Sequence, residues 1–273
     1  MENILFFFAN LPVYSYGAML GLGLLVGSYL AQREGKRKGI GSEFIYRFIV
    51  QATLVFIVAG RFSCVFRLHG WRVFLYPWVL FSSAQLDEGT GLLGAAVYTI
   101  YFLFMHVMNP AAFLDAITPS ISMMQSLAYL GSSVLGRETT SAWGVNLGEF
   151  SLHPLPLYSA LLYYAIFSYL WMARRNVRFD GQLFLGYLAL SALAQRILLS
   201  FREVYGESTI PWLYTLGFVI FGLIWLYMYM QSPLTEMRRR RREFRGWQSW
   251  LVYLASVVGA GLLMIKFFYW RFS

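Results

Sequence analysis

Two arginines lie inside stretches that are otherwise apolar enough to cross a membrane. Arg61 falls within an apolar window over residues 44–66, and Arg196 falls within a window over residues 181–200. An arginine inside a bilayer is costly, so it faces the bundle interior or a wet cavity, or extends to the headgroups. Guanidinium matches phosphate in a bidentate fork, so the two arginines together predict a polar cavity that holds a phospholipid phosphate. The alternative is that each arginine extends to the outer headgroups, or pairs with Asp115 or an outer glutamate.

A second group of polar side chains follows the apolar stretch that ends at residue 131. Gly136 and Arg137 precede Glu138, and His153 and Tyr158 stand at the start of the next apolar run. The unperturbed pKa of histidine, about 6.5, suits proton transfer near neutral pH, so His153 is a candidate general base. The alternatives are a solvated Arg137–Glu138 pair, and a His153 that caps its helix or contacts headgroups.

The composition places these residues in a membrane protein. Of 273 residues, 58% are hydrophobic and 13% are charged, whereas soluble domains carry about 25% charged residues. The net charge of +9 is concentrated at the ends of apolar runs, where anionic lipid accounts for it better than nucleic acid does. The one cysteine, Cys64, allows no internal disulfide, and we expect no metal site and no cofactor. The start of the chain has no basic region and no cleavage site, so no cleaved signal peptide is expected.

Eight apolar windows of spanning length predict an all-α, polytopic integral membrane helical bundle. They cover residues 14–32, 44–66, 90–108, 113–131, 154–173, 181–200, 211–231 and 247–268. A shorter apolar piece over residues 71–83 predicts an interfacial or re-entrant segment, because it is too short to cross. Asp115, near the start of its window, is interpreted as a helix-start residue. Glycines at four-residue spacing in the first window, which include Gly23 and Gly27, predict close helix packing.

Basic residues predict the orientation of the chain. They follow the first, fifth and seventh windows, and eight crossings place these three loops on one side. That side is the cytoplasm by the positive-inside rule. The N-terminus, residues 131–153, residues 201–210 and the C-terminus then face outward. We expect a membrane domain over residues 1–235, and a basic cytoplasmic loop with an additional transmembrane helix over residues 236–273.

The order of the short motifs carries more information than any one of them. The series along the chain is Tyr16-Gly17, Gly60-Arg61, Gly91-Leu92-Leu93-Gly94, Asp115-x-x-x-Pro119, Gly136-Arg137-x-Thr139-x-x-x-Trp143-Gly144-Val145, His153-Pro154-x-x-Leu157-Tyr158, and Gly181 followed by Arg196. In this order and within these windows, the series resembles the prolipoprotein diacylglyceryl transferase family over roughly residues 10–231.

The resemblance implies a multi-pass enzyme of the bacterial cytoplasmic (inner) membrane, with seven family-like helices and an added eighth. Such an enzyme moves diacylglyceryl from phosphatidylglycerol to the lipobox cysteine of a prolipoprotein, whose signal peptide is the implied partner. The resemblance places Arg137 and Arg196 near the phosphate, with His153 and Tyr158 around the outer mouth. The candidate catalytic residues are His153 and Arg196. The candidate substrate-binding residues are Arg137, Arg61, Tyr16, Gly136, Tyr158 and Gln125.

Several hallmark residues of the family are replaced in this chain. The family pattern Gly-Arg-x-Gly-Asn-Phe-x-Asn-Gly-Glu corresponds to residues 124–133, where Gln125, Ala128, Gly131 and Ser133 stand for its arginine, two asparagines and glutamate. The family histidine before Gly-Gly-Leu-Ile-Gly is Gly89, and the tyrosine and glutamate around Arg196 are Ala192 and Ser200. Losing transition-state donors raises a barrier by several kcal/mol. We therefore expect weakened or lost transfer activity.

Two rival functions remain from the sequence. The chain is either a divergent transferase, or a non-catalytic paralogue that binds phospholipid or lipoprotein or serves as a membrane subunit of a larger assembly. In the latter case the extra helix is a docking surface for a membrane protein partner. A transporter built from inverted repeats is disfavoured, because no internal repeat stands out.

Overall fold

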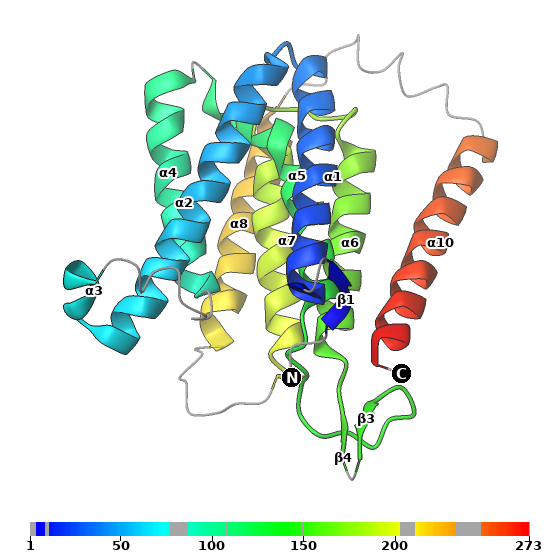
Figure 1. The fold of residues 1–273 in the computed structure, drawn as a ribbon. Helices are drawn as coiled ribbons and strands as arrows, with labels where there is room; N and C mark the ends of the chain where they lie inside the picture. The colour runs from blue at the N-terminus through cyan, green and yellow to red at the C-terminus, as the bar shows by residue number, and fades with distance from the viewer. Residues whose placement is uncertain are drawn as a thin grey trace. The chain divides into compact units, whose positions relative to one another are not determined.

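Helices dominate the fold, which confirms the expected all-α class. The computed structural model describes residues 4–8, 11–76, 87–107, 109–148, 150–202, 211–232 and 247–272. Its helices are α1 (Ser15–Arg37), α2 (Ser42–His69), α3 (Arg72–Leu75), α4 (Glu88–His106), α5 (Pro110–Gly131), α6 (Leu155–Ala173), α7 (Gln182–Leu198), α8 (Pro211–Gln231) and α10 (Trp247–Phe272) (Figure 1). Two antiparallel hairpins join β1 (Ile4–Phe8) to β2 (Leu11–Tyr14), and β3 (Val145–Leu147) to β4 (Phe150–Leu152).

Each predicted apolar window contains a helix, and the chain is a multi-pass membrane protein. Within the described residues, five helices are long and apolar enough to span a bilayer: Ser42–His69, Gly89–His106, Leu155–Ala173, Pro211–Gln231 and Trp250–Phe272. The apolar helix α7 is shorter. A count of seven family-like helices plus one stays a prediction. The piece over residues 71–83 was predicted to be interfacial or re-entrant. Within it, α3 covers Arg72–Leu75, and residues 77–86 lie outside the described part of the chain.

The chain forms two compact units, residues 32–113 and residues 1–31 with 114–273. In the unit over residues 32–113, α2 packs on α4. A Cβ on Gly94 would come within 2.6 Å of the Ala59 Cβ, so glycine lets these helices approach closely. The Phe48 ring lies 5.0 Å from that of Phe102 and 5.1 Å from that of Phe113. The domain boundary expected after residue 235 stays a prediction.

In the other unit, small and hydroxyl side chains let α1, α5 and α6 pack closely. A Cβ on Gly23 would lie 3.1 Å from the Met124 carbonyl oxygen, and one on Gly27 would meet the Met124 side chain at 2.3 Å. These contacts confirm the packing role predicted for the glycines. Ser122 Oγ and Ser126 Oγ donate to carbonyl oxygens of α6, each at 2.8 Å. The hydroxyl groups of these two serines are thereby satisfied within an apolar bundle.

Asp115 stabilises the beginning of a different helix from its own. It is fully buried in the second turn of α5. Its Oδ2 accepts from Gly181 N at 3.0 Å, and its Oδ1 accepts from Leu183 N at 2.9 Å and Phe184 N at 3.0 Å. These N–H groups belong to the start of α7, where a carboxylate is favoured by the helix dipole. The prediction that Asp115 serves the start of its own helix is therefore wrong.

Several chain ends meet at one end of this unit. Arg271 of α10 donates to Ser15 Oγ at the start of α1 and to the Leu130 carbonyl oxygen near the end of α5. Tyr269 donates to the Trp143 carbonyl oxygen, just before β3. The start of α1, residues 131–153 and the end of α10 thus lie together (Figure 1). The side of the membrane that they face stays a prediction.

Candidate functional site

A short extended segment after α5 carries the candidate site. Gly136 N donates to the His153 carbonyl oxygen at 2.9 Å, and His153 N donates to the Arg137 carbonyl oxygen at 3.0 Å. Thr139 N donates to the Ser151 carbonyl oxygen at 2.8 Å, so residues 136–139 run alongside β4. On the opposite edge, Arg137 N donates to the Phe201 carbonyl oxygen at 3.0 Å. These bonds fix the backbone on which Arg137 and His153 stand.

Gly136 allows this segment to lie against the turn that follows α7. A Cβ at position 136 would lie 2.3 Å from the Phe201 carbonyl oxygen, and real Cβ atoms do not come so close. The candidate substrate-binding role of Gly136 stays a prediction, but its packing role is clear. It lets the chain carry Arg137 past Phe201 without distortion.

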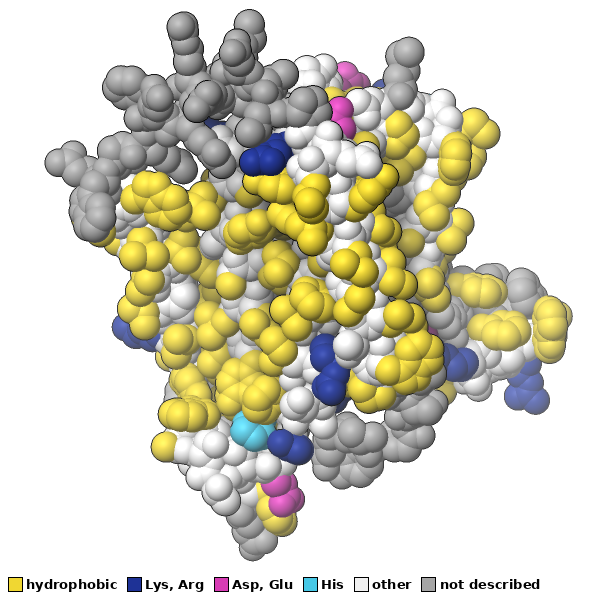
Figure 2. Space-filling view, turned by 180° about the vertical axis from the view of Figure 1, so that it is seen from behind, with side chains coloured by type: hydrophobic (Ala, Val, Ile, Leu, Met, Phe, Trp, Pro, Cys, Tyr) yellow, Lys and Arg dark blue, Asp and Glu magenta, His cyan; other side chains and the backbone are white. Residues whose placement is uncertain are grey.

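A polar pocket of about 550 Å³ opens on this segment. Its lining residues are Arg137, Glu138, Thr139, Thr140, Phe150, Ser151 and His153. In Figure 2, a histidine and charged side chains lie close together low in the view, next to the hydrophobic side chains that cover the helices. A guanidinium with hydroxyl groups nearby suits an anionic, oxygen-rich ligand such as a phosphate.

His153 sits between the pocket and two aromatic rings. Its Nδ1 lies 3.3 Å from the Tyr158 hydroxyl, and its ring centre lies 5.2 Å from that of Phe201. Partial burial lowers the pKa of His153 below its usual value, and the positive charge of Arg137 lowers the pKa further. His153 is therefore neutral at pH 7 and has a nitrogen that accepts a proton. The structure brings together four of the candidate residues: Gly136, Arg137, His153 and Tyr158.

Arg196 has an exposed side chain in the last turn of α7, and it is not one of the residues that line the polar pocket. Its neighbour Gln195 faces inward instead. The Gln195 Nε2 donates to the Tyr163 hydroxyl at 3.0 Å and to the Tyr129 hydroxyl at 3.4 Å. The pairing of Arg196 with Arg137 on one phosphate stays a prediction.

Gln125 is half-buried and hydrogen-bonds to a neutral side chain. Its Oε1 accepts from the Tyr187 hydroxyl at 2.7 Å. The Tyr129 and Tyr163 rings stack with centres 5.3 Å apart, and Gln195 bonds to both hydroxyls. Tyr163, Tyr187 and Gln195 were not predicted from the sequence. Their only signal is a polar group in an apolar window, and a window does not reveal which polar groups face each other.

Tyr16 and Arg61 belong to different units. Tyr16 is half-buried in the first turn of α1, beside Gly131: a Cβ on Gly131 would lie 3.0 Å from the Tyr16 Cα. Arg61 is half-buried on α2, in the unit over residues 32–113, and follows buried Gly60. The substrate-binding roles of Tyr16 and Arg61 stay predictions.

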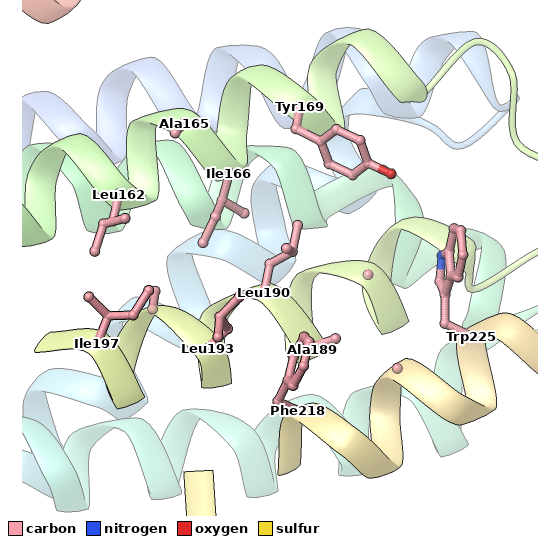
Figure 3. A pocket seen from close by; sticks show the side chains of 13 residues that line it. Leu162, Ala165, Ile166, Tyr169, Ala189, Leu190, Leu193, Ile197, Phe218 and Trp225 are labelled. Carbon is pink, nitrogen blue, oxygen red and sulfur yellow. The ribbon is translucent and has the colours of Figure 1, made fainter. Parts of the chain in front are cut away.

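An apolar groove of about 430 Å³ lies between α6, α7 and α8. Figure 3 shows aliphatic and aromatic side chains from the three helices that point into it, among them Leu162, Ile166, Leu190, Leu193, Phe218 and Trp225. The polar atoms of its side chains are the Tyr169 hydroxyl and the Trp225 indole nitrogen. A hydrocarbon chain fits such a lining, and a charged headgroup does not.

Comparison with known proteins gives the family. The sequence model described as prolipoprotein diacylglyceryl transferase matches residues 3–228. A phosphatidylglycerol–prolipoprotein diacylglyceryl transferase of Clostridioides difficile strain 630 is 22% identical over 200 residues, which cover 71% of this chain and 81% of that protein. The protein of the same name from Campylobacter jejuni subsp. doylei is 24% identical over 238 residues, 81% of this chain and 85% of that protein. The one from Bacillus cytotoxicus is 23% identical over 261 residues, 87% of this chain and 96% of that protein.

The match covers all four residues that the structure brings together, and it ends before α10 begins. Low identity over most of each protein agrees with the replaced hallmark residues. The resemblance carried by the ordered motifs is therefore confirmed. This chain belongs to the prolipoprotein diacylglyceryl transferase family.

Proposed function

We propose that this chain is a divergent diacylglyceryl transferase-like protein of the bacterial inner membrane, with weakened or lost transfer activity. It binds phosphatidylglycerol and takes a prolipoprotein signal peptide as its second partner. The observation that carries the proposal is the polar pocket, in which the guanidinium of Arg137 and the neutral imidazole of His153 stand on a family scaffold. The names of the relatives supply the lipid and the acceptor.

The two cavities suit the two halves of a phospholipid. Arg137 provides a fork of donors for the phosphate, and the groove between α6, α7 and α8 accepts an acyl chain. In the family reaction the lipobox thiolate forms a carbon–sulfur bond to the glyceryl carbon as the carbon–oxygen bond to phosphate breaks, and glycerol phosphate leaves. A neutral His153 is suited to accept the thiol proton, because the thiolate is the nucleophile.

Neutral side chains that face the bundle interior support weakened activity. Where the family has an arginine, Gln125 bonds to Tyr187, and next to exposed Arg196 the inward-facing side chain is the neutral Gln195. Removing one preorganised donor from a transition state costs about 10²–10³ in rate. Several such replacements together support a much slower reaction.

The second candidate is a non-catalytic paralogue that binds phospholipid or lipoprotein. It is favoured by hydrogen bonds between neutral side chains: Tyr187 donates to Gln125, and Gln195 donates to Tyr129 and Tyr163. The alternative in which the chain is a membrane subunit that docks to a protein partner through its C-terminal helix has less support. Phe268 of α10 is fully buried in its own chain, so that face of the helix is already covered.

Complementation separates the two candidates. The chain is expressed in a strain depleted of its own transferase, with the Clostridioides difficile relative as positive control, and thioether-linked lipid on a reporter lipoprotein is measured by mass spectrometry. We expect no growth rescue and at least about a 100-fold lower yield of modified reporter than the relative gives. Full rescue would overturn the weakened-activity proposal.

Binding of phosphatidylglycerol in mixed-lipid nanodiscs tests the site itself. We expect Arg137→Gln to lower the affinity by about tenfold, because it removes a charge-assisted contact. Arg175→Gln changes an exposed arginine just beyond the opposite end of α6 and is the matched control. Equal binding by both variants would refute the headgroup site. An Arg196→Ala variant with unchanged binding would refute the role of Arg196 alone.

A further inference from the structure

The C-terminal helix α10 lies outside the family match, yet one of its faces is part of the core of the unit. The match ends at residue 228, and α10 covers Trp247–Phe272. Met264 and Phe268 are buried in a cluster with Leu130 of α5 and Val145 of β3. Hydrophobic side chains on the other face are exposed: Val252, Leu262, Leu263 and Trp270. The helix therefore has a defined inner face, directed at its own chain.

Arg271, in the last turn of α10, binds the end of α5. One guanidinium nitrogen donates to the Leu130 carbonyl oxygen at 3.0 Å and to Ser15 Oγ at 2.9 Å, and another donates to the Ser132 carbonyl oxygen at 2.6 Å. Ser15 Oγ in turn donates to the Gly131 carbonyl oxygen at 2.8 Å. The last carbonyl groups of a helix have no partner within it, so these donors satisfy α5 where it ends.

Tyr269 binds the same segment further along. Its hydroxyl donates to the Trp143 carbonyl oxygen at 2.5 Å. Arg271 thus holds the segment at residue 132 and Tyr269 holds it at residue 143. The pocket residues Arg137, Glu138, Thr139 and Thr140 lie between these two points. Both anchors come from residues in the last turn of α10.

We propose that α10 is an internal brace of the polar pocket, in which Arg271 and Tyr269 are positioning residues that fix the two ends of segment 132–143. Neither side chain lines the pocket. They act by limiting the conformations of the segment that presents Arg137 toward His153. The pocket of this chain therefore depends on a helix that the family match does not include.

Hydrogen exchange in the full-length chain in nanodiscs tests the brace. The reporters are the bonded amides of Gly136, Arg137 and Thr139, whose protection depends on local opening. We expect Arg271→Gln to raise exchange of peptides over residues 132–147 by about tenfold, and Tyr269→Phe to raise it by about threefold. Peptides within α6 and α7 keep their exchange rates, because the bundle itself stays folded.

Matched controls come from the same helix. Lys266→Gln removes an exposed cation of α10, and Tyr253→Phe removes a hydroxyl that donates to the Ser168 carbonyl oxygen at the other end of the helix. Both should leave residues 132–147 unchanged. Arg271→Lys keeps the charge and some donors, so exchange should return to within about threefold of the unchanged chain.

Three outcomes would overturn the proposal. They are unchanged exchange over 132–147 in Arg271→Gln, an equal rise in the Tyr253→Phe control, and no recovery in Arg271→Lys. If Arg271→Gln does not fold, Tyr269→Phe alone decides, because it removes one hydroxyl and keeps the ring. The exchange measurement requires no catalytic activity, so its failure is separate from failure of the proposed function.

Discussion

At the scale of single residues, the polar pocket places a permanent cation beside a titratable base. The guanidinium of Arg137 and the imidazole of His153 line the same pocket, and a backbone hydrogen bond from His153 N to the Arg137 carbonyl oxygen fixes their spacing. A cation near a histidine disfavours a second positive charge, as does partial burial. The pair therefore keeps His153 in the form that accepts a proton.

The pKa of His153 should respond to the charge of Arg137. Arg137→Gln removes the repulsion and should raise the pKa of His153 toward its ordinary value, about 6.5. Labelled-histidine NMR can follow this titration, because the chain has three histidines, and His153→Asn assigns the signal. Arg175→Gln is the control. A pKa of His153 that falls or stays the same in Arg137→Gln would contradict the assignment.

The sign of the effect on stability follows from the same shift. The folded-state pKa of His153 lies below the unfolded value, so the unfolded chain binds more protons between the two. The stability that the neutral His153 contributes is complete above about pH 6.5 and is lost as the pH falls through that value toward the folded-state pKa. The variant His153→Asn should lose this part of the pH dependence in thermal unfolding.

Asp115 gives a second test at this scale. An Asn side chain offers one acceptor oxygen, so Asp115→Asn loses part of the set of three N–H bonds at the start of α7. We expect the free energy of unfolding to fall by about 1–3 kcal/mol. Glu43→Gln changes an exposed carboxylate on α2 and is the control in detergent unfolding. Equal stability of the two variants would contradict the capping role.

At the scale of elements, the close approach of α1 to the end of α5 decides where the candidate segment begins. A Cβ on Gly131 would lie 2.7 Å from the Ser15 carbonyl oxygen and 2.7 Å from the Met19 Cβ. Backbone atoms on one side leave little room to adjust. The glycine that replaces a family asparagine is therefore required by this packing.

Gly131→Ala should separate the start of α1 from the end of α5. We expect a loss of about 1–3 kcal/mol in the free energy of unfolding, because the added methyl group has no free space. Gly21→Ala is the matched control: nothing lies within 4 Å of its added Cβ, and removing a helical glycine stabilises by about 0.5–1 kcal/mol. Variants of equal stability would show that the approach at Gly131 is not tight.

At the scale of the whole molecule, the chain combines a family scaffold with a helix beyond the family match. Contacts within one unit bring the start of α1, residues 131–153 and the end of α10 to one end. Eight crossings, an even number, predict that the two chain ends lie on the same side of the membrane. The positions of the basic residues predict that this side faces away from the cytoplasm.

Cysteine labelling tests that orientation. In a Cys64→Ser background, Asn146→Cys on β3 should react with an impermeant maleimide in intact cells, and Lys36→Cys at the end of α1 should react only after permeabilisation. Both side chains are exposed in the structure. The reverse pattern would invert the predicted topology and remove the pocket from the outer side.

The sequence by itself determined the membrane class, the eight helical segments and the family, because apolar length and ordered local motifs are properties of the linear chain. It also identified Gly23 and Gly27 as packing residues, since their spacing repeats along one helix face. Only the tertiary structure decided which polar groups meet. Gln195 and Arg196 are neighbours in sequence, yet one faces buried tyrosines and the other is exposed, because adjacent helical residues differ by about 100° in direction. Likewise, Arg271 meets Ser15 across nearly the whole chain, and only the packing of α10 against α1 and α5 determines that contact.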